Sequence, residues 1–409
     1  MSERRSAPSR TGLVHPPAPV LQVPHQPLVR VALVHQPLTD PHGQVAAFAL
    51  RDMPHQARRD LTSDGGLDAA YQDADLVCLA ADRPLLLQAT RRVLVGEEEF
   101  VVADLPAEQA QLGQVQPIVA WRHAHALRTS VSGFTGTEAE VVLLPKLTMV
   151  AIGADVGDNQ LGHLIDLAHS MGVMVVAQRV RTAAEHRRAF DLGVDLVEGR
   201  AMPDGELEQG GLSAGDISCL ELLGMLAEEP VDYEAITGLV ACDPNLAVGV
   251  LHLVNSAVFA LPAPVESVRQ AVVMVGPRLL RALAATSLNQ ARRADTDELW
   301  HVLAQALACW ELSEDDTGYT VGLLSAVIDQ RGVDPAWLAG MAGLSPAATD
   351  ALVSLGGPVG AALEALRAHE HGDAQVALDH GMDPHVVSRA WLEALTEARG
   401  IATALTTDP

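Results

Sequence analysis

The chain has 409 residues, which is enough for two domains of ordinary size. Hydrophobic residues make up 48% of it and aromatic residues only 3%, so its cores must be built from aliphatic side chains, which disfavours an aromatic-rich all-β sandwich. The formal net charge of -25 repels phosphate backbones and anionic lipid, so neither nucleic acid nor a membrane is expected as a partner.

The cysteines and the N-terminus favour the cytoplasm. Four cysteines lie far apart and form no CxxC pair, so neither a zinc knuckle nor a dithiol motif is expected. Each is predicted to be a small buried hydrophobic residue: Cys78, Cys219, Cys242 and Cys309. No apolar run approaches the roughly 18 residues of a membrane span, and the N-terminus lacks the apolar stretch of a secretory signal.

Residues 1–27 are rich in Pro, Ser and Arg and are predicted to be a disordered leader. The first domain is expected over residues 28–205. It opens with two apolar runs, 29–34 and 45–50, which predict a hairpin because the turn-forming residues Asp40-Pro41-His42-Gly43 lie between them.

A regular α/β pattern follows the hairpin. Short β runs are predicted at 99–105, 117–121, 128–132 and 149–153. An amphipathic helix at 158–170, an apolar strand at 173–177, a helix capped by Thr182 and Glu185, and a strand at 194–197 come next. Alternating strands and helices predict a parallel sheet, and about 180 residues would allow only a trimmed form of a β/α barrel, which usually takes about 250 residues.

The second domain is expected to be all-helical. A Gly-rich linker is placed at 206–215, the helical domain at 216–400 and a short tail at 401–409. Helix starts are predicted where an N-cap or a helix breaker precedes Pro, and at Asp232. The Pro-containing starts are Asp243-Pro244, Gly276-Pro277, Asp334-Pro335 and Ser345-Pro346.

Within the helical half, one series of motifs resembles the HDOD domain, a helical relative of the HD phosphohydrolases. The series runs from Cys242-Asp243-Pro244-Asn245-Leu246 through Leu253-Val254-Asn255-Ser256-Ala257-Val258-Phe259 to Val265-Glu266-Ser267-Val268-Arg269-Gln270-Ala271. Its signature residues are Asp243, Pro244, Asn255, Ser256, Phe259 and Gln270.

The first half resembles a degenerate EAL domain, a trimmed β/α barrel that hydrolyses cyclic di-GMP with metals when active. The similarity rests on five segments in order: His35-Gln36-Pro37-Leu38, Ser132-Gly133-Phe134, Val150-Ala151-Ile152-Gly153, Ala177-Gln178-Arg179-Val180-Arg181-Thr182 and Leu192–Gly199. Together the halves resemble the EAL–HDOD (YuxH-like) signalling family.

The resemblance implies that the catalytic ligands of the barrel are missing. A two-metal hydrolase needs carboxylate oxygens and a base that activates water. The motif glutamate aligns near Phe48 or Ala49, and the two later glutamates align with Gln178 and Arg181. The other motif positions hold residues without a carboxylate: Ser132, Gly133, Ala151 and Gly153. We therefore expect no metal, no cofactor and no cluster of anionic oxygens able to grip a divalent ion in the cavity.

Gln36 and Arg51 match positions that contact substrate in active EAL domains. An arginine fork could bind a phosphate. The alternative is that Gln36 shapes the end of a strand and Arg51 is a surface or supporting residue.

The helical half also lacks the expected metal ligands. The adjacent His-Asp pair of an HD enzyme is replaced by Ser325-Ala326 after Gly322-Leu323-Leu324. His369 and His371 have i, i+2 spacing, which places them on different helix faces. His123 and His125 are expected on a possible strand, in a surface or turn role.

These observations predict a non-catalytic signalling adaptor that binds other signalling proteins, with a homodimer as one possibility. The family resemblance links it to bacterial cyclic di-GMP signalling. Two alternatives stay open at this point: a sensor that binds the nucleotide through Gln36 and Arg51 without hydrolysing it, and a residual phosphodiesterase.

Overall fold

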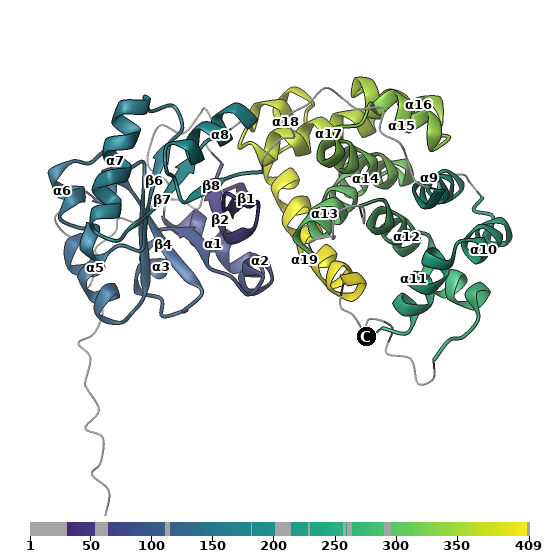
Figure 1. Cartoon of the computed structure of the whole chain (residues 1–409), viewed down its shortest axis with the longest axis horizontal. Helices are drawn as coiled ribbons and strands as arrows, with labels where there is room; N and C mark the ends of the chain where they lie inside the picture. Colours follow the sequence, from purple (N-terminus) through teal and green to yellow (C-terminus); the bar gives the residue numbers. More distant parts are fainter. Residues whose placement is uncertain are drawn as a thin grey trace, which may run out of the picture.

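The computed structural model describes residues 31–53, 64–110, 115–180, 182–200, 214–227, 230–256, 259, 264–289 and 296–406. The predicted leader (1–27) and most of the predicted linker (206–215) lie outside this part of the chain. The molecule has two halves side by side, a β/α barrel and a bundle of helices (Figure 1).

The N-terminal half is a closed eight-stranded barrel. Its strands, in chain order, are β1 (Leu33–Thr39), β2 (Val45–Asp52), β3 (Leu85–Gln88), β4 (Val101–Pro106), β5 (Arg128–Ser132), β6 (Met149–Gly153), β7 (Met174–Gln178) and β8 (Leu196–Glu198). β1 runs antiparallel to both neighbours, β2 and β8, whereas all pairs from β2 to β8 are parallel. The barrel is therefore complete in strand number, and it is kept small by short strands and short connections.

Successive side chains along each strand point alternately into and out of the barrel, which gives one apolar layer inside it and one beneath the helices. Residues that point into the barrel form a small inner cluster. This cluster consists of Leu38, Ala47, Ala49, Leu86, Val102, Met149, Ala151, Val176 and Leu196. Their sequence neighbours, such as Leu87, Val150 and Val175, point outward and pack under the surrounding helices. Because both faces are buried, the parallel strands are continuously apolar, as their sequences predict.

Short helices surround the barrel. They are α1 (Asp64–Asp73), α2 (Leu76–Ala80), α3 (Arg91–Val95), α4 (Ala107–Ala110), α5 (Val115–Ala124), α6 (Glu138–Val141), the 3-10 helix η1 (Leu144–Lys146), α7 (Asp158–Ser170) and α8 (Ala183–Asp191). Helix α7 has the predicted bounds, and the predicted capping box of Thr182 and Glu185 starts α8.

One predicted strand is wrong. Residues 117–121 belong to α5, which also contains His123. Val115, Ile118, Val119 and Arg122 are its buried residues, and this i, i+3, i+4, i+7 spacing is that of a helix. The short apolar run at Ile118-Val119-Ala120 was therefore one buried stripe of a helix. Strand β3 was missed because it has only four residues.

The C-terminal half is all-helical, as predicted. Its helices are α9 (Ala214–Leu226), α10 (Tyr233–Cys242), α11 (Pro244–Val254), α12 (Val268–Asn289), α13 (Thr296–Ser313), α14 (Asp316–Arg331), α15 (Pro335–Met341), α16 (Pro346–Ser354), α17 (Gly357–Glu370), α18 (Gln375–Asp379) and α19 (Pro384–Thr406). Helix α19 continues beyond residue 400, so residues 401–406 of the predicted tail are helical.

The predicted start signals lie where helices begin. Asp232, Asp243, Asp334 and Ser345 each accept a hydrogen bond from a backbone N–H in the first turn. Gly276-Pro277 instead interrupts α12, since Gly276 has φ 74° and ψ 169°. The prediction of four buried cysteines is partly wrong: Cys219 and Cys309 are buried, Cys78 is half-buried and Cys242 is exposed.

Among the described residues, the segment Val268–Leu288 of α12 is long and apolar enough to cross a membrane, and 61% of its most apolar window is buried in the protein. The bent pair α10 and α11 passes the same test only if both helices are counted as one span. Gly276 breaks the regular geometry of α12.

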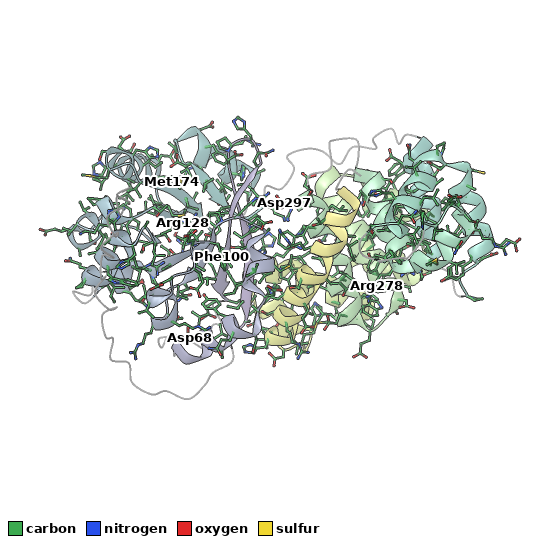
Figure 2. The ribbon with its side chains drawn as sticks, turned by 90° about the horizontal axis from the view of Figure 1, so that it is seen from below. Asp68, Phe100, Arg128, Met174, Arg278 and Asp297 are labelled. Atoms are coloured by element: carbon green, nitrogen blue, oxygen red, sulfur yellow. The ribbon has the colours of Figure 1, made fainter. Side chains whose placement is uncertain are left out.

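The two halves share an extensive interface. Helix α19 packs against β1 and α2 of the barrel, and α17 packs against β1 (Figure 1). The hydroxyl of Ser388 in α19 accepts a hydrogen bond from the backbone N–H of Leu33 at 2.8 Å and donates one to its carbonyl at 2.9 Å. Asp297 lies at this junction (Figure 2), where it pairs with Arg83 of the barrel at 2.7 Å.

Aromatic rings form the apolar centre of the interface. Phe48 of β2 stacks on His35 with centroids 4.7 Å apart, and Trp300 of α13 meets Phe48 edge-on at 5.4 Å. The guanidinium of Arg399 lies 5.3 Å from the centre of the Trp300 ring. Phe48 therefore joins the two halves.

Replacing Phe48 with Ala should lower the free energy of unfolding by about 3–5 kcal/mol, because it leaves a cavity between two packed domains. Urea denaturation of the full chain measures this loss. Phe48→Leu should cost clearly less, and Val142→Ala, at a barrel position that is 50% exposed, should change stability by no more than about 0.5 kcal/mol. A loss at Phe48→Ala no larger than that of the Val142 control would contradict this role.

Candidate functional site

Polar side chains gather at the end of the barrel where the parallel strands finish. Asp104 of β4, Gln178 of β7 and Glu198 of β8 each lie two residues beyond a member of the inner apolar cluster, so they share its inward direction. Arg51 follows Ala49 in the same way on β2. In β/α barrels this C-terminal end carries the functional sites, so we examine it as the candidate site.

Arg51 is held by two carboxylates. Its Nε donates to Glu198 Oε1 at 2.5 Å and its Nη2 donates to Glu198 Oε2 at 2.8 Å, which makes a two-pronged ion pair. Its Nη1 donates to Asp104 Oδ2. The side chains of Arg51, Asp104 and Glu198 are 18%, 0% and 4% exposed. The guanidinium is thus a nearly enclosed cation between two buried anions.

The protonation state of Arg51 follows from these contacts. Burial, the largest single influence, lowers its pKa, but the nearby carboxylates of Glu198 and Asp104 together raise the pKa above the ordinary value. Arg51 therefore stays charged at every pH at which the protein folds, and it compensates the two carboxylates.

Neutral polar groups complete the cluster. Ser130 of β5 donates its hydroxyl proton to Asp104 Oδ1 at 2.5 Å, and Gln178 donates from Nε2 to Glu198 Oε2 at 3.0 Å. We call Arg51, Asp104, Ser130, Gln178 and Glu198 the barrel-end cluster. Each of the four carboxylate oxygens accepts at least one hydrogen bond within it.

Gln36, the second predicted nucleotide contact, is also engaged within the chain. Its Nε2 donates to the backbone carbonyl of Glu370, at the end of α17 in the helical half, at 2.9 Å. Gln36 and Arg51 therefore do not form one site together. Each is hydrogen-bonded to a different partner within the chain.

The other predicted motif positions that the structure describes lie on strands β2, β5 and β6 or directly after them. Ser132 ends β5, Gly133 follows it with φ 70°, and Ala151 and Gly153 belong to β6. Ala49 faces the interior, whereas Phe48 faces the helical half. Arg181 lies outside the described residues.

The sequence analysis missed Asp104 and Glu198. The two carboxylates meet at this end of the barrel, and both bind Arg51. The prediction that no cluster of anionic oxygens there can grip a divalent ion stays a prediction. Both residues lie at the ends of predicted strands, and that position was the available signal. It was overlooked because only the positions of the family motifs were tested for carboxylates.

The barrel-end cluster does not fit the two metal ions that the family resemblance implies. Asp104 and Glu198 are already paired with Arg51, and a guanidinium at this position repels a divalent cation. Ala151 and Gly153 provide no side-chain oxygen. Among the residues that the structure describes, no three His, Cys, Asp or Glu side chains converge as a metal-binding group.

In the helical half, Ser325 and Ala326 are part of a dry core. Ser325 is fully buried in α14, and its hydroxyl accepts a hydrogen bond from Gln305 Nε2 of α13 at 3.0 Å. Ala326 is 2% exposed. A buried amide–hydroxyl pair thus occupies the place that the HD resemblance assigns to metal ligands.

The HDOD signature residues shape turns between helices. Asp243 caps α11 and Pro244 is its first residue. Asn255 bridges to the chain after the next turn, since its Nδ2 donates to the Val265 carbonyl at 2.9 Å and its Oδ1 accepts from the Val265 N–H at 2.7 Å.

The remaining signature residues make local contacts. Ser256 donates to the Leu253 carbonyl at 2.7 Å, Phe259 is partly buried against the core, and Gln270 lies in the exposed first turn of α12. The described contacts of these residues stabilise helix ends and turns of the fold.

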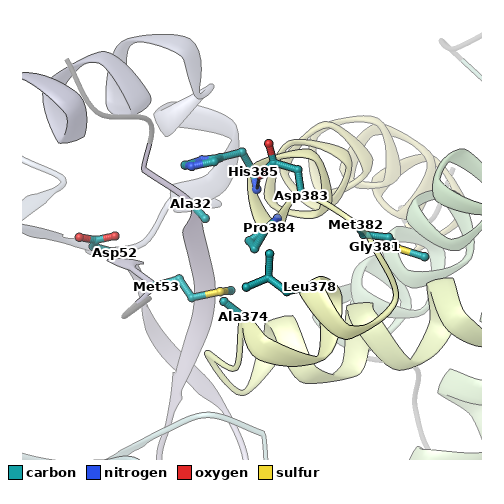
Figure 3. A pocket seen from close by; sticks show the side chains of 10 residues that line it. All are labelled: Ala32, Asp52, Met53, Ala374, Leu378, Gly381, Met382, Asp383, Pro384 and His385. Carbon is teal, nitrogen blue, oxygen red and sulfur yellow. Dashed lines mark hydrogen bonds between the residues drawn. The ribbon is translucent and has the colours of Figure 1, made fainter. Parts of the chain in front are cut away.

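A groove of about 390 Å³ lies between the halves (Figure 3), and no residue of the barrel-end cluster lines it. Its barrel side is formed by Ala32, Asp52 and Met53. Its other side is formed by residues of α18, α19 and the turn between them: Ala374, Leu378, Gly381, Met382, Asp383, Pro384 and His385. Neither Gln36 nor Arg51 lines it.

Comparison with known proteins identifies an HDOD domain at residues 218–341. A curated relative is the "Uncharacterized protein YuxH" of Bacillus subtilis, which is 28% identical over 106 residues. That alignment covers 26% of this chain and 26% of YuxH, so the match spans about a quarter of the curated relative. The predicted HDOD domain and the predicted YuxH-like resemblance are confirmed.

Solved structures similar to this chain include proteins that contain EAL domains. The PaMucR phosphodiesterase in complex with c-di-GMP is 13% identical, covers 42% of this chain and 94% of its own, and has a TM-score of 0.33. Klebsiella pneumoniae BlrP1 with manganese and c-di-GMP is 13% identical, covers 43% and 56%, and has a TM-score of 0.34. The EAL enzyme Bd1971 with cAMP is 12% identical, covers 41% and 61%, and has a TM-score of 0.30.

Replacing Arg51 with Met should destabilise the chain by about 3–5 kcal/mol near neutral pH, because two buried carboxylates lose their counter-charge. Chemical denaturation of the full chain provides the measurement. Adding Asp104→Asn and Glu198→Gln to Arg51→Met should restore much of the loss. The control Arg179→Met removes an exposed ion pair and should cost about 0–1 kcal/mol. Equal losses at Arg51 and Arg179 would refute the buried network.

Proposed function

We propose that this barrel–HDOD protein is a non-catalytic signalling adaptor that works in the cytoplasm through protein–protein contacts in a cyclic di-GMP-linked bacterial pathway. The support for the pathway is the HDOD domain together with the signalling proteins that the chain resembles. The support for a non-catalytic role is the barrel-end cluster, in which a resident guanidinium already takes the two carboxylates.

The energetics of this cluster favour the adaptor over a hydrolase. To bind a metal, Asp104 and Glu198 would have to release Arg51, which would leave a nearly enclosed guanidinium without an anion. Breaking a buried ion pair costs several kcal/mol. A residual phosphodiesterase would have to recover this cost from its metal ions.

The partner surface is expected on the outer face of the HDOD region. Val248 of α11 and Val273 of α12 are 67% and 56% exposed, although both helices are otherwise strongly apolar and packed. Leu253 and Val254 are 1% and 0% exposed and belong to the core. A protein partner would therefore contact Val248 and Val273 rather than Leu253 or Val254.

Affinity capture with the full-length chain tests this proposal, since the interface makes the separate halves unsuitable as baits. Val248→Asp with Val273→Asp should strongly reduce capture of the specific partner, because carboxylates would enter an apolar contact. The matched control is Val77→Asp, at a barrel position that is 70% exposed. Capture unaffected by the double change, or no specific partner for the wild type, would count against the adaptor.

The second candidate is a sensor that binds cyclic di-GMP without hydrolysis. One observation favours it: an arginine fork and a glutamine lie at the functional end of a barrel, and such forks bind phosphates. Against it, both side chains already have internal partners. A dianionic ligand would have to compete with Asp104 and Glu198 for the same guanidinium.

Isothermal titration of the wild-type chain with cyclic di-GMP should give no saturable heat at micromolar concentrations. Micromolar or tighter binding that disappears in Arg51→Met, with that variant shown to be folded by circular dichroism, would replace the adaptor with the sensor. Formation of linear dinucleotide above a no-protein blank, with magnesium or manganese present, would instead establish the phosphodiesterase.

A further inference from the structure

Three histidines lie buried where the barrel meets the helical half. His35 comes from β1, His301 from α13 and His369 from α17, and they are 6%, 8% and 1% exposed. None of them belongs to the barrel-end cluster. Buried histidines at a junction between two domains are placed to couple proton binding to domain contact.

The rings that pack on His35 and His301 favour the neutral imidazole, whereas the hydrogen bond from His35 to the Leu79 carbonyl favours the protonated form. His35 Nε2 donates to the Leu79 carbonyl at 2.9 Å, and its ring stacks on Phe48. His301 packs edge-on against Trp391 with centroids 5.4 Å apart. A proton added to either ring would introduce a charge among aromatic and aliphatic groups.

One carboxylate and one guanidinium face this group directly. Glu370 of α17 brings Oε1 within 3.3 Å of His301 Nδ1. Arg200, which follows β8, adds positive charge that acts on both His35 and His301, so it opposes their protonation. A second proton would therefore be less favourable than the first.

The other charged groups around the interface are paired with one another. Arg83 pairs with Asp297 at 2.7 Å and Arg399 with Asp82 at 3.0 Å, both across the interface. In the helical half, Arg367 pairs with Asp329 at 2.9 Å. Exposed His371 acts on that aspartate, and Asp52, Asp383 and His385 line the adjacent groove.

The pKa directions agree with the geometry. Burial is the main cause that lowers the pKa of His35 to about 4, and it also lowers the pKa of His369 to about 4. Burial lowers the pKa of His301 well below its ordinary value. Burial acts oppositely on the acid, and raises the pKa of Glu370 to about 7.

We propose that the interface between the barrel and the helical half is a proton-operated latch, closed near neutral pH and opened in mildly acidic solution by protonation of His35, His301 and His369. Opening would release the contact between Gln36 and the Glu370 carbonyl, and would uncover the aromatic cluster of Phe48 and Trp300. The latch would change which surface the protein presents without requiring either half to unfold.

The direction follows from proton linkage. The three histidines take up protons near pH 6.5 when exposed, and only at clearly lower pH when buried, so acidification below about 6.5 favours the open form. Glu370 acts in the opposite direction, because its raised pKa lets the closed form hold a proton between about 4.5 and 7. The net effect is an uptake of about two protons on opening.

Small-angle X-ray scattering of the full chain between about pH 7.5 and pH 5 tests the latch, with circular dichroism on the same samples. The radius of gyration should rise on acidification while helicity is retained. Two net protons correspond to an opening constant that rises about 100-fold per pH unit between about pH 6 and pH 5, where exposed histidines are protonated and the buried ones are not.

Glutamine variants decide whether the histidines cause the opening. His35→Gln or His369→Gln should reduce the rise of the opening constant to about tenfold per pH unit. The double variant should nearly abolish the pH dependence of that constant. If the double variant does not fold, the single variants carry the test. The control His380→Gln, at a partly exposed position paired with Glu364, should leave the wild-type dependence unchanged. A constant radius of gyration, loss of helicity together with expansion, or glutamine variants that titrate like the wild type would each overturn the proposal.

Discussion

The end of the barrel depends on one constraint: a buried guanidinium must be matched by buried carboxylates. Arg51 lies on β2, Asp104 on β4 and Glu198 on β8, so the ion pairs form only when the barrel closes and β8 reaches β1. Removing Arg51 would leave two buried carboxylates without a counter-charge in a place that water barely reaches. Ser130 and Gln178 add one further hydrogen bond to each carboxylate.

The cluster lies at the end of the barrel that carries the functional sites in β/α barrels, and here an arginine from the protein itself supplies positive charge between the carboxylates. The helical half shows a parallel arrangement, with Gln305 and Ser325 hydrogen-bonded inside the core. At both of these places the polar groups hydrogen-bond to one another.

Prediction from the sequence was most accurate where local chemistry decides the structure. The N-caps at Asp243 and Ser345, the capping box at Thr182 and the bounds of α7 were all predicted, because each depends on residues within one turn. The error at residues 117–121 arose because five apolar-rich residues fit both a strand and one stripe of a helix. These residues form helix α5 because Ile118 and Val119 are buried together on one face of it, which is a tertiary contact.

The sequence by itself determined the classes of the two halves and the HDOD resemblance, since these depend on composition and local order. Only the tertiary structure decided that Asp104 and Glu198 meet Arg51, that Gln36 bonds to Glu370 and that Phe48 faces Trp300. These partners are 53 to 334 residues apart in the chain. A charge or a ring becomes a site only through its neighbours in space, and barrel closure and domain packing choose those neighbours.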